Sequence, residues 1–193
     1  MTSTSAKGFS LLELVMVLGV AGVLLAVAVP RMGTFRGSDD PHNLSNALSL
    51  AKLRAASNFS KARLFVDING RAHHVEWYQR TAPIGWVALN GPTLLTNGNA
   101  FAFGPVNAPP PNTQPAILQA PSCLDNAGVV IAGTACIVFN SRGIPVDGTD
   151  APTNVDAVYV TDGTLVGSVT VTATGLISVW STASTATPAW AHK

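Results

Sequence analysis

A long apolar run near the N-terminus constrains this chain more than any other feature. From Phe9 to Val29 the sequence has 21 consecutive residues, and Glu13 is the only charged one among them. As a helix the run would be about 31 Å long at about 1.5 Å per residue, which matches the ~30 Å hydrocarbon core of a bilayer. The run therefore predicts an N-terminal helix that first anchors the chain in a membrane.

Glu13 needs an explanation within such a helix. A carboxylate near the start of a membrane helix costs roughly 2 to 3 kcal/mol, and less near an interface. We therefore expect a partner for it. No other side chain of the apolar run is charged, so the partner must come from elsewhere.

The residues around this glutamate carry a family resemblance. The stretch Lys7-Gly8-Phe9-Ser10-Leu11-Leu12-Glu13-Leu14 resembles the cleavage site of type IV prepilins and type II secretion pseudopilins. The resemblance implies that a prepilin peptidase cuts between Gly8 and Phe9 and then methylates the new amine of Phe9. It also implies that Glu13 serves subunit assembly by pairing with that amine in a neighbouring subunit, because an α-amine with a reference pKa near ~8 is cationic.

An ordinary secretory signal, cut near Ala26-Val27-Ala28, is the alternative reading of the same run. The apolar core of such a signal usually has only ~7 to 15 residues, which is shorter than this run. We therefore keep the prepilin reading. It divides the chain into a leader (1–8), a hydrophobic membrane and filament-core helix (9–37) and an extracytoplasmic head (38–193).

Composition supports an extracytoplasmic head with a β-rich fold. Only 11% of residues are charged and the net charge is +1, so no global field attracts nucleic acid. Cys123 and Cys136 are the two cysteines, and an even count in an oxidising compartment predicts a disulfide between them. Two buried free thiols are the alternative.

A second helix follows the first. Asp40 can cap it, with Pro41 in the first helical position. Its apolar residues recur at spacings of three and four, which predicts a stripe that lies on a sheet. The stripe consists of Leu44, Ala47, Leu48, Ala51, Ala55 and Phe59. Whether this helix is continuous with the first or breaks near Gly37 is left open.

The periodicity changes to two at about Lys61. The segments 63–67 and 72–78, joined through Asn69-Gly70, predict a β-hairpin. The proline-rich segment 104–122 predicts an irregular surface excursion, and the tail from Ser181 is expected to be mobile. The remaining strands are predicted at 84–89, 100–103, 129–131, 136–139, 157–160, 168–172 and 176–180.

The second half carries a looser resemblance. The stretch Phe139-Asn140-Ser141-Arg142-Gly143, with a last hairpin that turns at Thr174-Gly175, is similar to the GspH/FimT-type minor pilins and pseudopilins. That resemblance implies an α+β fold: a long N-terminal hydrophobic helix followed by a second helical segment packed on antiparallel β-sheet. It also implies a place at or near the tip of a filament.

No catalytic or metal site is expected. His73 and His74 are adjacent in a predicted strand, so their side chains face opposite ways and cannot easily share a ligand. Asp147, Asp150 and Asp156 could hold calcium, but their spacing matches no loop motif, which favours a solvated turn. We therefore expect no enzyme activity, no metal and no cofactor.

Some FimT-like proteins bind DNA through an arginine just after the turn glycine of the last hairpin. This chain has Gly175-Leu176-Ile177-Ser178 there, and residues 81–193 offer only Arg142 and Lys193 as basic residues. Phosphate contacts require such residues, so we do not expect nucleic acid as a partner.

The sequence thus predicts a minor pilin-like structural subunit, with a GspH-type pseudopilin of type II protein secretion as the first choice. A type IV pilus minor pilin is the alternative, and a DNA-binding pilin in natural transformation is a third. The expected partners are other pilins or pseudopilins, the prepilin peptidase and the inner membrane. The expected localisation is the bacterial inner membrane, single-pass, with a periplasmic or extracellular head and filament association after assembly.

Overall fold

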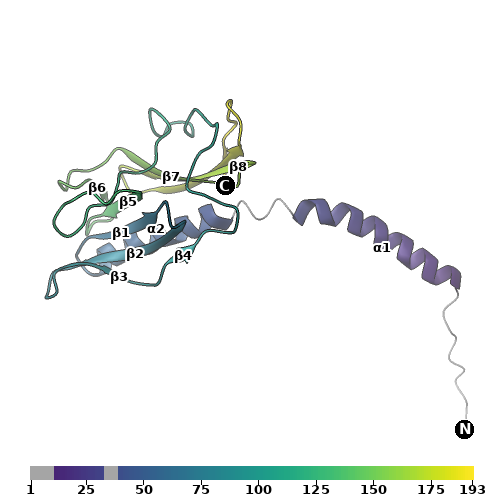
Figure 1. Ribbon diagram of the computed structural model, residues 1–193, viewed down its shortest axis with the longest axis horizontal. Coiled ribbons are helices and arrows are strands. Elements are labelled where there is room, and N and C mark those ends of the chain that lie inside the picture. The colour runs from purple at the N-terminus through teal and green to yellow at the C-terminus, as the bar shows by residue number, and fades with distance from the viewer. Residues whose placement is uncertain (1–10, 33–38) are drawn as a thin grey trace, which may run out of the picture. The chain divides into compact units, whose positions relative to one another are not determined.

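The computed structural model describes residues 11–32 and 39–193 and divides the chain into two compact units, Met1–Arg36 and Gly37–Lys193. The first unit contains α1 (Leu11–Met32). The second contains α2 (Asp39–Ser57) and the strands (Figure 1). Each unit is described by itself below.

The predicted membrane anchor is not supported by the structure. None of the helices in the described ranges is long and apolar enough to cross a membrane. The sequence count of 21 residues included Glu13 and also Phe9, which lies outside the described residues. From Leu14 to Pro30 only 17 consecutive residues are free of charge, about 26 Å of helix against the ~30 Å needed. The predicted single-pass localisation in the inner membrane is therefore wrong.

The predicted fold class is also wrong. The described chain has two helices, of 22 and 19 residues, and no long N-terminal helix packed on a sheet. The second unit is mostly antiparallel β-sheet. The physical reason lies in the residues of its strands, because β-branched valine and threonine recur in segments such as 155–161 and 165–172 and favour the pleated backbone of strands.

Two antiparallel sheets form the second unit. The first sheet has the order β3-β2-β1-β5-β6, with β4 also paired to β2. The second sheet has the order β10-β9-β8-β7. The strands of the first sheet are β1 (Ala62–Asp67), β2 (Ala72–Gln79), β3 (Gly85–Ala88), β4 (Thr93–Leu94), β5 (Thr134–Phe139) and β6 (Pro145–Val146). Those of the second are β7 (Val155–Thr161), β8 (Leu165–Thr172), β9 (Ile177–Ala183) and β10 (Ala191–His192).

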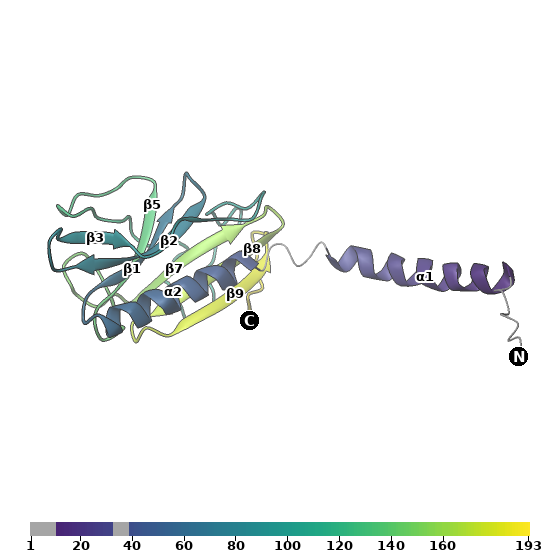
Figure 2. The ribbon, with the colours of Figure 1, turned by 90° about the horizontal axis from the view of Figure 1, so that it is seen from below.

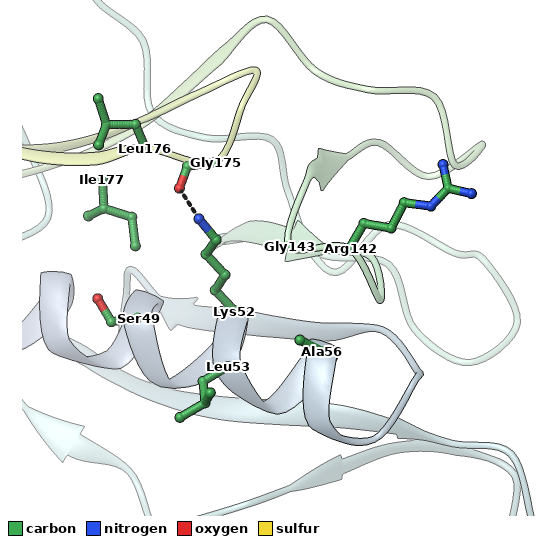
Figure 3. Close-up of a pocket in the computed structure, with 9 residues that line it drawn as sticks. All are labelled: Ser49, Lys52, Leu53, Ala56, Arg142, Gly143, Gly175, Leu176 and Ile177. Atoms are coloured by element: carbon green, nitrogen blue, oxygen red, sulfur yellow. Dashed lines mark hydrogen bonds between the residues drawn. The ribbon is translucent and has the colours of Figure 1, made fainter.

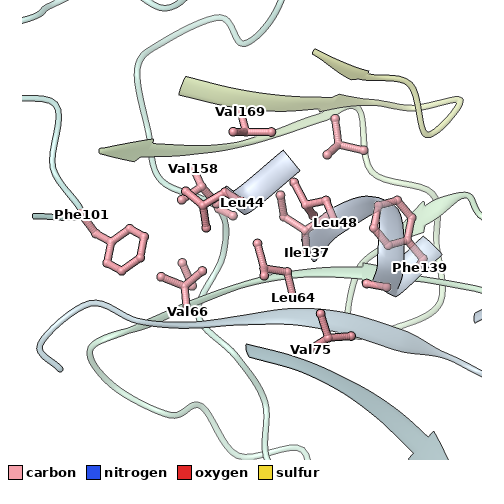
Figure 4. Packing of buried hydrophobic residues seen from close by; sticks show 14 of the residues in the cluster. Leu44, Leu48, Leu64, Val66, Val75, Phe101, Ile137, Phe139, Val158 and Val169 are labelled. Atoms are coloured by element: carbon pink, nitrogen blue, oxygen red, sulfur yellow. The ribbon is translucent and has the colours of Figure 1, made fainter. Parts of the chain in front are cut away.

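The core lies where α2 packs against both sheets. Figure 2 shows α2 lying along β8 and β9, and α2 also contacts β7 of the second sheet and β1, β2 and β5 of the first. Leu44 and Leu48 of α2 are fully buried. In Figure 4 they lie among side chains of both sheets, including Val158 of the second and Leu64 of the first. The apolar stripe seen in the sequence makes this contact, except that Phe59 lies beyond the helix and is exposed.

Asp40 does not cap α2 as predicted. The helix begins at Asp39, and the Asp40 carboxylate is buried. It accepts hydrogen bonds from Thr96 N and Thr96 Oγ1 and, at 2.6 Å, from Asn99 Nδ2. Asp40 therefore ties the start of α2 to the loop after β4.

The hairpin between β1 and β2 forms as the sequence predicts, with Leu64 opposite Val75. Its turn differs in detail, because Arg71 and not Gly70 has the positive φ of 53°. Two predicted strands do not form. Segments 100–103 and 129–131 contribute only the isolated bridges Ala100 to Thr161 and Leu124 to Val130.

The C-terminal tail and the proline-rich segment are more ordered than the sequence suggests. β10 pairs with β9, and Trp190 Nε1 donates a hydrogen bond of 2.9 Å to the carbonyl of Ala108. In the proline-rich segment Val106 is buried in a small second cluster around Tyr159. This segment is irregular, as predicted, but it covers part of the second sheet and is not only a surface excursion.

Candidate functional site

Between Leu11 and Val20, α1 presents an apolar surface that no described residue of its unit covers. Seven of its large apolar side chains are exposed in the described range. They are Leu11, Leu14, Val15, Met16, Val17, Leu18 and Val20. Exposed aliphatic residues on consecutive positions surround the helix, so this surface suits burial against other helices on more than one side.

Glu13 lies in the first turn of α1 and is exposed. Within the described residues no basic group lies within salt-bridge distance of it. A carboxylate in the first turn is favoured by the positive end of the helix dipole. Gly8 and Phe9, the predicted cleavage and methylation positions, lie outside the described residues, as does the leader 1–8.

The disulfide between Cys123 and Cys136 is formed, with the two Cα atoms 4.9 Å apart. It joins the segment before residue 131 to β5. A backbone bond strengthens the same junction, because Cys136 N donates to Pro121 O at 2.7 Å, and a second bond, from Ile131 N to Cys123 O at 2.8 Å, closes the segment on itself. The bridge therefore fixes the segment 121–131 on the face of the first sheet opposite α2.

That face carries a cleft of about 570 Å³, which we call the outer cleft. Its floor includes Arg63 of β1, Tyr78 of β2 and Trp86 of β3. Its walls come from the segment 121–130 and from the turn after β6. Strand alternation explains the floor, because Leu64 points to the core and its neighbour Arg63 points the opposite way.

Arg63 is almost fully buried and all of its contacts are internal. Its Nε donates a hydrogen bond of 2.6 Å to Glu76 Oε2, and its Nη2 forms an ion pair with the same oxygen. Its Nη1 donates to the backbone carbonyl of Leu124. Its guanidinium carbon lies 4.0 Å from the centre of the Trp86 ring. Burial lowers the pKa of Arg63 from its usual value, and the charge of Glu76 opposes that change. Arg63 therefore connects Glu76 of β2, the Trp86 ring of β3 and the backbone at Leu124.

The three aspartates considered for calcium do not form a metal site. The described residues contain no group of three or more histidine, cysteine or acidic side chains that could hold a metal ion. Asp147 Oδ1 accepts hydrogen bonds from the side chain and backbone of Thr149 and from Ala151 N, and these bonds lower its pKa. Asp150 pairs with Lys61 at 2.5 Å. Asp156 lies on β7, where its buried carboxylate accepts a bond of 2.7 Å from Thr153 Oγ1.

His73 and His74 face opposite sides of β2, as the sequence predicts. His73 is buried near α2, its Nδ1 has no hydrogen-bond partner in the described chain, and burial lowers its pKa. His74 stacks on Phe65 at 4.9 Å, and its Nε2 lies 3.1 Å from Glu76 Oε1. The two imidazoles therefore have separate structural environments.

A second cavity, of about 460 Å³, lies beside the turn of the last hairpin (Figure 3). Lys52 of α2 reaches into it, and its Nζ donates a hydrogen bond of 2.8 Å to Gly175 O. Arg142 also lines this cavity, but in Figure 3 its guanidinium points away from Lys52. The sequence showed no basic residue at this turn, because Lys52 lies 123 positions away.

Two features of these sites were missed by sequence reasoning. The outer cleft is built from residues scattered between 61 and 156, and only Arg63 within an otherwise apolar strand gave a hint of it. Lys52 lies off the apolar stripe of α2, and its position in the sequence gives no sign of its partner.

A comparison of the chain with known protein families, with curated proteins and with solved structures found no match.

Proposed function

We propose that this chain is a structural subunit of a pilin-like filament, in which α1 packs against the equivalent helices of other subunits. The observation that carries the proposal is the uncovered apolar surface of α1 around Glu13. Burying one leucine or valine side chain is worth about 1.5 to 3 kcal/mol, so covering this surface is a strong driving force for assembly.

Glu13 gives that assembly its register. A carboxylate within a helix–helix contact is stable only if a cation meets it there. The resemblance of residues 7–14 to prepilin cleavage sites supplies one in the amine of Phe9 of a neighbouring subunit. The pair would form only when the two helices are correctly staggered.

The second unit fits the part that such a subunit displays. Its strands close into two sheets around α2, and its disulfide suits an oxidising environment. We propose a role in assembly, with the pseudopilus of type II protein secretion as the specific filament.

Co-expression with complete sets of filament subunits tests this proposal. The tagged full chain would be expressed with the major and minor pseudopilins of a type II secretion system or, separately, with those of a type IV pilus. Recovery in sheared filaments or in a pull-down with the first set is expected. Recovery with the second set only would contradict the choice of system, and recovery with neither would contradict the proposal as a whole.

Processing provides a separate test. Mass spectrometry of the full chain co-expressed with a prepilin peptidase should show a chain that begins with methylated Phe9. A chain that begins at or beyond Val27 would contradict the prepilin reading.

A further inference from the structure

The outer cleft is lined by more acidic than basic residues, and its basic residues are already paired with other groups of the chain. It is lined by two basic residues, Lys61 and Arg63. Lys61 is paired with Asp150, and Arg63 is satisfied by Glu76 and Leu124. Both cations of the lining therefore already have partners within the chain.

The carboxylates of the cleft keep oxygens without partners among the described residues. Asp125 and Asp147 each accept their hydrogen bonds through Oδ1 alone, to stabilise their own turns. Asp156 uses only Oδ2, which accepts from Thr153. The Oδ2 atoms of the first two and the Oδ1 atom of Asp156 thus accept no hydrogen bond from the described chain.

Asp156 is the most informative of the three. It is only 8% exposed, yet it lines the cleft and receives a single hydrogen bond. A carboxylate can accept about four. Its Oδ1 is not one of the enclosed side-chain atoms that lack a partner, so this oxygen is open to the cleft and a ligand that donates hydrogen bonds can reach it.

The ligand chemistry follows from what surrounds these oxygens. A divalent metal is excluded by geometry, because the described residues do not gather three metal-ligating side chains. The aromatic rings of Trp86 and Tyr78, which meet edge to face at 5.4 Å, make part of the lining apolar. A lining that combines carboxylates with aromatic rings suits an organic cation on an aliphatic stem, such as the side chain of arginine or lysine.

We propose that the outer cleft is a binding site for a basic side chain presented by a partner polypeptide. The disulfide positions the wall that carries Asp125, and β7 supplies Asp156. This inference concerns the second unit and does not depend on α1, so its failure would leave the proposed function untouched. It assigns the cleft a partner with positively charged residues at the contact.

A set of short capped peptides tests the proposal on the full chain. One peptide contains a single arginine between glycines, a second contains lysine in its place, and a third contains citrulline, which has the shape of arginine without its charge. Saturable binding, followed by nuclear magnetic resonance at fixed ionic strength, is expected for a basic peptide, with affinity at least tenfold above that of the citrulline peptide. Equal affinity for the three peptides, or no saturable binding, would overturn the proposal.

Variants locate the binding within the chain. Asp156→Asn keeps the shape of the side chain and should weaken basic-peptide binding roughly tenfold or more. Asp39→Asn is the matched control, because Asp39 is exposed at the start of α2 and makes the same change in net charge outside the cleft. It should leave the affinity unchanged, and equal losses in the two variants would show non-specific attraction and refute the site.

A second variant guards against a folding defect in the first. Val138→Phe adds bulk to a residue of β5 that lines the cleft and changes no charge. It should abolish basic-peptide binding. Undiminished binding by this variant would place the peptide elsewhere and refute the site.

Discussion

Lys52 of α2 and Gly175 of the last hairpin are joined by a hydrogen bond of 2.8 Å, although 123 positions separate them in the sequence. The ammonium group donates to the backbone carbonyl at the turn between β8 and β9. The same turn lies directly against the turn at Gly143, whose carbonyl oxygen occupies the space that a side chain on Gly175 would need. Gly175, at the turn of the second sheet, therefore contacts both Lys52 of α2 and the turn at Gly143, which follows β5 of the first sheet.

Gly175→Ala should destabilise the second unit for two reasons. The residue has a φ of 76°, which favours glycine, and an added Cβ would overlap Gly143 O. Gly163→Ala is the control, because Gly163 has a φ of 89° but has no atom within 4 Å of an added Cβ. We expect a loss of about 1 kcal/mol for the control and at least about 2 kcal/mol for Gly175→Ala in urea unfolding. Equal losses would show that the close approach of the two turns does not matter.

Leu48→Ala should be among the most damaging changes to α2. Its side chain is fully buried between the two sheets, so its removal leaves a cavity and should cost about 2 to 5 kcal/mol. Leu53→Ala, on the same helix at 66% exposure, should cost less than about 1 kcal/mol. Chemical denaturation of the two variants measures the difference, and similar losses would contradict the packing described for α2.

The pair between Arg63 and Glu76 should be strongly coupled. Arg63 is 3% exposed, so Glu76→Gln strands a buried charge and should destabilise the chain by about 3 to 5 kcal/mol. The double variant Arg63→Met with Glu76→Gln removes both charges and should recover part of that loss. If the loss of stability in the double variant equals the sum of the losses in Glu76→Gln alone and Arg63→Met alone, the two residues do not interact.

Asp156 should make stability fall as the pH rises. Burial raises the pKa of its carboxyl in the folded chain, so between the unfolded and the folded pKa the folded state holds a proton that the unfolded state has released. Its contribution is present below the unfolded pKa of about 3.9 and is lost as the pH rises through the higher folded pKa. Asp156→Asn lacks this titration, so its stability relative to the parent should increase from pH 4 to pH 7. A constant or falling difference would contradict the burial of this carboxyl.

Local patterns allowed part of the fold to be predicted from the sequence. The period of three and four residues in α2, and the alternation on both sides of Asn69-Gly70, reflect which faces are buried, so both elements were predicted close to their true bounds. The small and polar residues of the tail from Ser181 predict mobility. The order of this tail comes from β10 pairing with β9 and from Trp190, and such contacts leave no local signal.

Features that depend on distant contacts or on exact length could not be predicted. The bond between Lys52 and Gly175 depends on a contact between distant parts of the sequence, and so does the outer cleft, whose lining comes from both sheets. The N-terminal run illustrates the dependence on exact length, because Glu13 shortens its charge-free part below the length that the total count of apolar residues suggests. The disulfide was predictable because two cysteines allow only one intramolecular pairing.

We propose that the chain assembles through α1, with Glu13 as the charge that sets the register of the helices. The most direct test compares the parent, Glu13→Gln and the control Asp39→Asn for recovery in sheared filaments after co-expression with type II pseudopilins. Glutamine keeps the shape of Glu13 but removes its charge, so a neighbouring amine would lose its partner at a cost of about 3 to 5 kcal/mol if buried. We expect at least a tenfold loss of Glu13→Gln from the filaments, with a folded second unit, and full recovery of Asp39→Asn. Normal recovery of Glu13→Gln would show that the charge of Glu13 does not set the register of assembly.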